Sequence, residues 1–193
     1  MPQETKRTIP SDLIEATAFE LMRRAAIEIP EDFRLGVEAM VDTEAEDLSR
    51  FVLESMVENW HAAEEDRRAM CADTGLPRYY VKAGNEAVIG GGFVALERAL
   101  RRATARATHE IPLRPNRVHP LSRADHNNNV GINAPEIEFS FEPDADWLDI
   151  TTVHKGGLFG TDYRMLFPGD GKDGIKRFFL DTMMQSGRRR LAC

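Results

Sequence analysis

The sequence is poor in cysteine and has no long apolar run, which argues against a disulfide-rich protein and against a membrane-spanning one. Two cysteines, Cys71 and Cys193, stand among 193 residues, so we expect no disulfide framework. The longest mostly apolar run, residues 87–96, is too short and too rich in glycine to cross a bilayer, and the start MPQETKRTIP lacks the apolar core of a secretory signal. We therefore expect a cytoplasmic protein without a membrane partner.

Positive charge is also scarce. The chain carries 25 Lys and Arg against 32 Asp and Glu, and its formal net charge of −7 argues against broad binding of nucleic acid. Hydrophobic residues make up 42% of the chain, which is enough for a packed core in one large domain or two small ones. The composition is that of an ordinary globular protein.

The first seventy residues show apolar side chains at helical spacing. Residues 11–28 predict a first helix, capped by Ser11 and stopped by Pro30, and Pro30 with its acidic neighbours predicts the start of a shorter second helix. Residues 45–69 predict a third, longer helix with one apolar face. Cys71 follows it directly.

The rest of the chain combines strands with further helices. Residues 78–82 predict a strand, and residues 136–142 and 147–153 alternate in polarity, which predicts two adjacent strands in a hairpin. Further expectations are a helix over 93–108, a strand over 163–167 and a helix over 173–184 ended by Gly187. Residues 111–135 are rich in proline and asparagine and lack periodicity, which predicts a long segment that is either functional or disordered. The fold class is α+β, with N-terminal helices followed by a mixed sheet with packed helices.

Cys71 opens the stretch CADTG at the turn before the first predicted strand. A thiolate is a soft ligand for an iron–sulfur cluster or zinc, and Asp73 and Thr74 would place a carboxylate and a hydroxyl beside it. A lone cysteine is more often a small buried apolar residue. A nucleophilic cysteine is a third reading, although no spacing pairs Cys71 with any of the five histidines.

Two other motifs have chemistry that the spacing alone leaves open. Arg114, in the proline-rich stretch LRPN, is suited either to bidentate binding of a carboxylate or to a surface salt bridge. Gly156, in the stretch KGG, follows a predicted strand, where backbone N–H groups can approach an anion or form a plain turn. The glycine-rich residues 169–174 match neither a P-loop nor an EF-hand.

The motifs CADTG, VKAG, LRPN, NNNVGINAP and KGG are followed by a cysteine beyond a helix, and CADTG with the later KGG and this cysteine is a fairly specific combination. In this order the chain resembles the α-type catalytic domain of class I fumarases and L-tartrate dehydratases, from about Leu48 to Cys193. The resemblance implies an iron–sulfur hydro-lyase that adds or removes water across a carbon–carbon bond of a small dicarboxylic acid such as fumarate, malate or tartrate. In that family three cysteines hold a 4Fe–4S cluster whose open iron acts as a Lewis acid.

The resemblance also assigns residues. Cys71 and Cys193 match cluster ligands, and Asp73 matches the catalytic aspartate. Arg114 and Gly156 match groups that contact the substrate. Asn129 and Gly131 match a motif with a loop-shaping role.

The chain departs from the family pattern at several points. Ala72 replaces a glutamine whose amide touches substrate, Leu158 replaces a third glycine after KGG, and the third cluster cysteine is not in the chain. We expect residues 1–193 to be the N-terminal portion of the catalytic domain, completed by further chain and by a β-type domain or subunit in an oligomer. The alternative is a non-catalytic dicarboxylate-binding or regulatory paralogue that lacks a complete cluster.

Overall fold

The computed structural model describes residues 7–156 and 163–189. The chain divides into two compact units, Met1–Lys155 and Gly156–Cys193, and each is described by itself. The predicted α+β fold class is confirmed, because the first unit combines helices with a mixed sheet. None of the helices in the described ranges is long and apolar enough to cross a membrane.

The three N-terminal helices lie where the apolar spacing predicts them. They are α1 (Ser11–Ile27), α2 (Glu31–Thr43) and α3 (Asp47–Asp66). Pro30 separates α1 from α2 and stands directly before the first residue of α2, where its missing N–H costs no hydrogen bond. Ala18 and Met22 of α1 are fully buried, so this helix presents its apolar face to the core.

A three-stranded sheet forms the centre of the first unit. Strand β2 (Leu76–Gly84) lies in the middle, parallel to β4 (Glu136–Glu142) and antiparallel to β5 (Leu148–Lys155). The predicted hairpin between the last two strands is therefore wrong, because β2 separates them. Alternating polarity identifies a half-buried strand but does not say which strand it pairs with.

The connection between β4 and β5 crosses the end of β2. Gly84 N–H donates to the Trp147 carbonyl at 2.9 Å, and Glu86 N–H donates to the Ala145 carbonyl at 2.8 Å. A Cβ atom on Gly84 would overlap the Ala145 carbonyl. Glycine at this position therefore permits the close backbone approach that lets the connection pass over β2.

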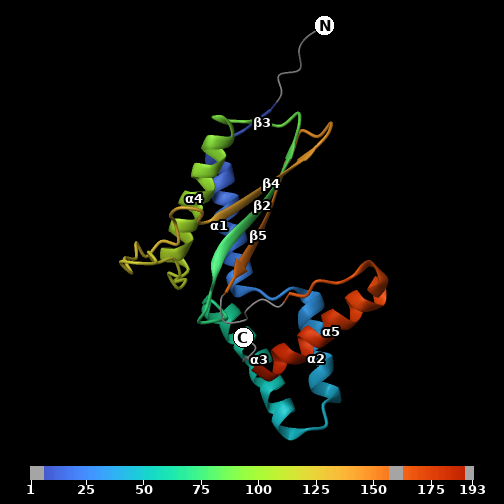
Figure 1. Ribbon diagram of the computed structural model, residues 1–193. Helices are drawn as coiled ribbons and strands as arrows, with labels where there is room; N and C mark the ends of the chain where they lie inside the picture. The colour runs from blue at the N-terminus through green and yellow to red at the C-terminus, as the bar shows by residue number, and fades with distance from the viewer. Residues whose placement is uncertain (1–6, 157–162, 190–193) are drawn as a thin grey trace. The chain divides into compact units, whose positions relative to one another are not determined.

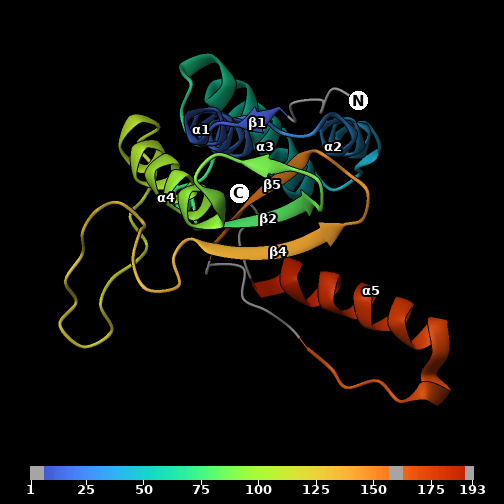
Figure 2. The same cartoon turned by 90° about the horizontal axis from the view of Figure 1, so that it is seen from above.

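Helices α1 and α4 (Gly92–Glu110) lie side by side against one face of the sheet (Figures 1 and 2). Alternate residues of β2, among them Tyr79, Val81 and Ala83, point into this interface and are buried. From α4 they meet Leu96, Ala99, Leu100 and Ala103, all fully buried. The opposite face of β2 carries Arg78 and Lys82, which pair with Glu136 and Glu142 on β4.

A second, two-stranded parallel sheet joins β1 (Thr8–Ile9) to β3 (Val88–Ile89), and the sequence did not predict it. Two residues are too few to show a periodicity. Gly90 follows β3 and donates its N–H to the Ile9 carbonyl at 2.9 Å.

The second unit contains a 3-10 turn, η1 (Pro168–Asp170), and helix α5 (Gly171–Arg189). The predicted helix is confirmed, but its predicted end is wrong because α5 continues past Gly187. The strand predicted for residues 163–167 is also wrong, since these residues have no regular structure. Aromatic and apolar residues such as Tyr163, Met165 and Phe167 form a strand only where a partner strand offers hydrogen bonds, and no described strand pairs with them.

Candidate functional site

The loop that carries Cys71 is anchored by two hydrogen bonds of the preceding residue, Met70, one from its N–H and one to its carbonyl. Met70 N–H donates to the Ala26 carbonyl at the end of α1 at 3.0 Å, and the Met70 carbonyl accepts from Asn59 Nδ2 of α3 at 2.9 Å. Cys71 itself is partly buried and its thiol is free. The loop then reaches β2 through Gly75, whose φ of 72° favours glycine.

Asp73 and Arg114 lie next to each other, although they are 41 positions apart in the sequence. Arg114 Nη1 is 3.7 Å from Asp73 Oδ1. The side chain of Asp73 is 6% exposed, whereas that of Arg114 is 59% exposed. The carboxylate is therefore sheltered, and the guanidinium stays open to a second anion.

A hydrogen bond joins the loops that carry these two residues. Arg114 N–H donates to Thr74 Oγ1 at 2.9 Å. Thr74 is buried, so little water competes for this bond. The CADTG and LRPN motifs therefore form one structural element rather than two independent loops.

Asn129 forms hydrogen bonds with the backbone of the LRPN loop. It is 1% exposed and has a φ of 56°, a left-handed conformation that asparagine tolerates better than most residues. Its Oδ1 accepts from Asn116 N–H at 2.7 Å, and its Nδ2 donates to the Arg114 carbonyl at 3.1 Å and to Thr108 Oγ1 at 3.2 Å. The predicted loop-shaping role of Asn129 thus has a definite set of contacts.

Gly131 begins a tight turn two residues later. Gly131 N–H donates to the Ala134 carbonyl at 2.8 Å, and Arg101 Nη1 donates to the carbonyls of Gly131 and Ala134 at 2.8 and 3.1 Å. A Cβ atom on Gly131 would overlap the guanidinium of Arg117. The glycine therefore makes room for a second arginine of the LRPN loop.

Strand β5 ends close to the start of β2. Its last residue, Lys155, pairs with Leu76, so it lies at the end of the sheet that the CADTG loop enters. Gly156 follows Lys155 directly in the chain, while Gly157 falls outside the described residues. The role of Gly156 in binding substrate stays a prediction.

His154, one residue before Lys155, is held inside the first unit. Its Nε2 lies 3.0 Å from the Met22 carbonyl, and since a carbonyl only accepts, Nε2 carries the proton. Burial lowers the pKa of His154 below its usual range, and the backbone groups of Met22 and Thr74 partly oppose this shift. Nδ1 is buried and makes no hydrogen bond of normal geometry within the described part of the chain. The lowered pKa favours the neutral imidazole, with Nε2 bonded to the Met22 carbonyl.

The described residues contribute a single thiol to the predicted metal site. Cys71 has the ligand chemistry that an iron–sulfur cluster requires, but Cys193 lies outside the described residues. Within residues 7–156 and 163–189, no group of three or more His, Cys, Asp or Glu side chains is placed to hold a metal ion. Both cluster assignments stay predictions.

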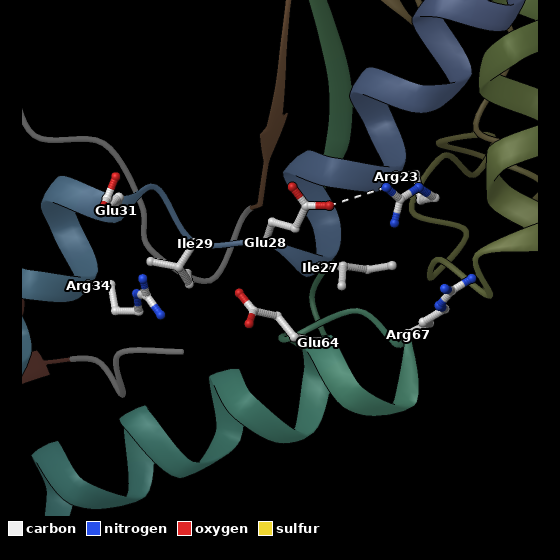
Figure 3. Close-up of a pocket in the computed structure, with 8 residues that line it drawn as sticks. All are labelled: Arg23, Ile27, Glu28, Ile29, Glu31, Arg34, Glu64 and Arg67. Atoms are coloured by element: carbon white, nitrogen blue, oxygen red, sulfur yellow. Dashed lines mark hydrogen bonds and ion pairs between the residues drawn. The ribbon is translucent and has the colours of Figure 1, made fainter.

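A polar cavity of about 700 Å³ lies where α1 ends, α2 begins and α3 ends (Figure 3). It is lined by two isoleucines, three arginines and three glutamates, namely Ile27, Ile29, Arg23, Arg34, Arg67, Glu28, Glu31 and Glu64. Arg23 already pairs with Glu28 at 3.2 Å. Its formal charges balance, so the cavity has no excess of positive charge for a dicarboxylate, and none of the predicted site residues lines it.

The structure brings Asp73 and Arg114 together and supports them with Asn129, as far as the described residues extend. Sequence reasoning missed the contact between Thr74 and Arg114, and it missed Asn116. Threonine after an aspartate in a turn is common, so nothing in the sequence marked its hydroxyl as the acceptor for a distant loop.

Comparisons with known proteins point to one family. Residues 15–193 match the sequence model of the family described as fumarate hydratase (Fumerase). A protein provisionally named L(+)-tartrate dehydratase subunit alpha, from Methanocaldococcus jannaschii, is 35% identical over 179 residues, which is 90% of this chain and 62% of that protein. L(+)-tartrate dehydratase subunits alpha from Escherichia coli K12 and Shigella sonnei are each 25% identical over 186 residues, or 95% of this chain and 60% of those proteins. The chain thus spans about three fifths of the length of the curated relatives it matches.

Proposed function

Since the chain belongs to the fumarate hydratase (Fumerase) family, we propose that it contributes the catalytic aspartate and a carboxylate-binding arginine to a hydro-lyase acting on a small dicarboxylic acid. The named relatives are tartrate dehydratase alpha subunits, which supports a substrate of the fumarate, malate or tartrate type. The reaction adds water across a carbon–carbon double bond or removes it.

The pairing of Asp73 with Arg114 is the observation that carries this proposal. A dicarboxylate needs a cation for a carboxylate group and an acid or base near the carbon that gains or loses a proton. Arg114 offers its exposed guanidinium for bidentate binding, and Asp73 lies 3.7 Å behind it. Substrate bound to Arg114 would therefore be held beside the Asp73 carboxylate.

Each side chain has a distinct task in this arrangement. Arg114 orients the substrate by gripping one carboxylate, so that the reacting carbons face the protein. Asp73 accepts or positions a proton near the hydroxyl that is lost or gained. Its shelter from solvent, with 6% of the side chain exposed, strengthens its interaction with a nearby hydroxyl or cation.

We propose Cys71 and Cys193 as two ligands of a 4Fe–4S cluster, with Gly156 contacting substrate. The free, partly buried thiol of Cys71 fits this use, since thiolates are the ligands that iron–sulfur clusters take. When bound, the cluster would supply a Lewis-acidic iron that makes hydroxide a better leaving group. The chain has two cysteines, so a third thiolate must come from elsewhere.

The proposal extends to partners and to the position of the chain in a larger protein. The relatives are named as alpha subunits and are longer than the aligned region, which supports residues 1–193 as the N-terminal portion of a catalytic domain. We propose that a β-type domain or subunit and the third cluster ligand complete the site in an oligomer.

The test uses the intact natural enzyme with its partner, reconstituted anaerobically with iron and sulfide. Hydration of fumarate is followed by the loss of absorbance of its carbon–carbon double bond, and dehydration of malate and tartrate by the gain of absorbance from the unsaturated product. We expect Cys71→Ser to lower both the cluster absorption and the turnover by more than tenfold. Full activity in Cys71→Ser would overturn the cluster assignment.

The same preparation separates catalysis from simple binding. The two-cysteine chain and Ala72 are the features that favour a non-catalytic dicarboxylate-binding relative. Calorimetric binding of a dicarboxylate that is abolished by Arg114→Ala, with no turnover of any of the three acids, would establish that alternative instead.

A further inference from the structure

We propose that Thr74 and Asn129 are positioning residues that clamp the backbone of Arg114 from both sides, and so set how tightly the site binds a substrate carboxylate. This inference rests on the proposed function, in which Arg114 is the carboxylate ligand. It adds two residues of the CADTG and NNNVG motifs whose side chains act through Arg114.

The clamp uses both polar groups of the Arg114 backbone. The N–H donates to Thr74 Oγ1 at 2.9 Å, and the carbonyl accepts from Asn129 Nδ2 at 3.1 Å. Pro115 follows directly and restricts the backbone of the residue before it to extended conformations. The backbone of Arg114 is thus fixed by two side chains and one ring.

The clamping groups are themselves rigidly held. Thr74 is 8% exposed and Asn129 is 1% exposed. Asn129 is tied to Thr108 Oγ1 on α4 and to Asn116 N–H. Thr108 in turn donates to the Thr104 carbonyl at 2.8 Å within α4. The chain of contacts therefore runs from a buried helix to the loop that carries the guanidinium.

Arg114 combines a fixed backbone with a free head group, since its side chain is 59% exposed. A fixed backbone leaves only the side-chain rotations to be ordered when an anion binds, which lowers the entropic cost of binding. Without the clamp the whole LRPN loop would have to be ordered as well. Loss of the clamp should therefore weaken substrate binding more than it slows the chemical step.

The experiment measures KM and kcat of the intact enzyme with its best substrate among fumarate, malate and tartrate. Thr74→Val removes the hydroxyl at nearly constant shape, and Asn129→Gly removes the amide while tolerating the left-handed backbone. Matched controls are Thr151→Val, exposed on β5, and Asn127→Gly, which is exposed with a φ of 54°. Neither control residue contacts Arg114.

We expect Thr74→Val to raise KM about fivefold, the effect of losing one net hydrogen bond, with kcat within about twofold of the natural enzyme. Asn129→Gly should raise KM at least as much, because it also loses the bonds to Asn116 and Thr108. Thr74→Ser should restore KM, because it keeps the hydroxyl. When Arg114→Ala is already present, adding Thr74→Val should change KM less than about twofold, since the two residues act as one unit. The controls should leave KM and kcat unchanged.

Two results would overturn the inference, and they differ from failure of the proposed function. If Arg114→Ala raises KM but both clamp variants do not, the clamp is absent while the role of Arg114 stands. If Thr74→Val raises KM equally with and without Arg114, Thr74 acts by another route. If Arg114→Ala itself leaves KM unchanged, the proposed function fails. Melting curves identify a variant that does not fold, and the remaining clamp variant then decides.

Discussion

Replacing Tyr79 with phenylalanine should measure how firmly the central strand is joined to the helices that cover it. Tyr79 is fully buried in the middle of β2, and its hydroxyl lies 3.0 Å from Thr104 Oγ1 of α4 and 2.8 Å from Met22 Sδ of α1. Thr104 Oγ1 uses its own proton to donate to the Leu100 carbonyl at 2.9 Å. The Tyr79 hydroxyl is therefore the donor toward Thr104 Oγ1 and Met22 Sδ.

The loss of stability in Tyr79→Phe depends on which groups lose a hydrogen-bond partner. The variant loses one buried hydrogen bond and leaves a small void, but Thr104 keeps its own bond to Leu100, so no donor is orphaned. We therefore expect a loss of about 1–2 kcal/mol in the free energy of unfolding. For a chain of this size that is a fall in Tm of roughly 2–8 °C.

Tyr80→Phe is the matched control, because Tyr80 is the next residue of β2 and points to the opposite face. It is 38% exposed, and its hydroxyl accepts from Arg78 Nη1 at 3.2 Å in solvent. Its removal should change the free energy of unfolding by less than about 0.5 kcal/mol. Urea and thermal denaturation followed by circular dichroism compare the two variants. Equal losses in both would refute the reasoning.

Tyr79→Phe should also change how stability depends on pH in the alkaline range. Burial raises the pKa of Tyr79 above its usual value, so in the folded state this phenol keeps its proton at a pH where the unfolded chain loses it. Stability must therefore fall as pH rises through about 10, and Tyr79→Phe should remove part of that fall.

Two further predictions concern glycine and histidine. Gly84→Ala places a Cβ against the Ala145 carbonyl and should lower the free energy of unfolding of the first unit by about 2–4 kcal/mol. The control Gly36→Ala, in α2 with nothing within 4 Å of the new Cβ, should raise it by about 0.5–1 kcal/mol. Denaturant titration compares the two variants, and no loss of stability in Gly84→Ala would show that the close backbone approach does not form. Because burial lowers the pKa of His154 from 6.5, the unfolded chain binds more protons just below that pH, and stability should fall as pH drops through 6.5. His154→Gln should flatten the Tm between pH 7.5 and 5.5, and an unchanged slope would place the imidazole in solvent.

Local patterns in the sequence were enough to predict most individual elements. On α1 the apolar stripe is buried, whereas Phe33 of α2 and Phe51 of α3 are exposed. Helical spacing nevertheless located α1 to α3 within a few residues, because the apolar side chains of each helix recur at the helical period. Alternation located β4 and β5 for the same reason. It failed for pairing, since β2 lies between them and the β4–β5 connection passes close to Gly84 at the end of β2. Such a contact joins residues about sixty positions apart and leaves no local signal.

The candidate site divides in the same way. The sequence by itself determined which residues have the right chemistry: a thiol at Cys71, a carboxylate at Asp73 and a guanidinium at Arg114. Only the tertiary structure decided that Arg114 lies 3.7 Å from Asp73 and that Thr74 and Asn129 hold its backbone. Motifs record which side chains are present, whereas their distances depend on how helix α4 and strand β2 pack and on the loops that this packing brings together.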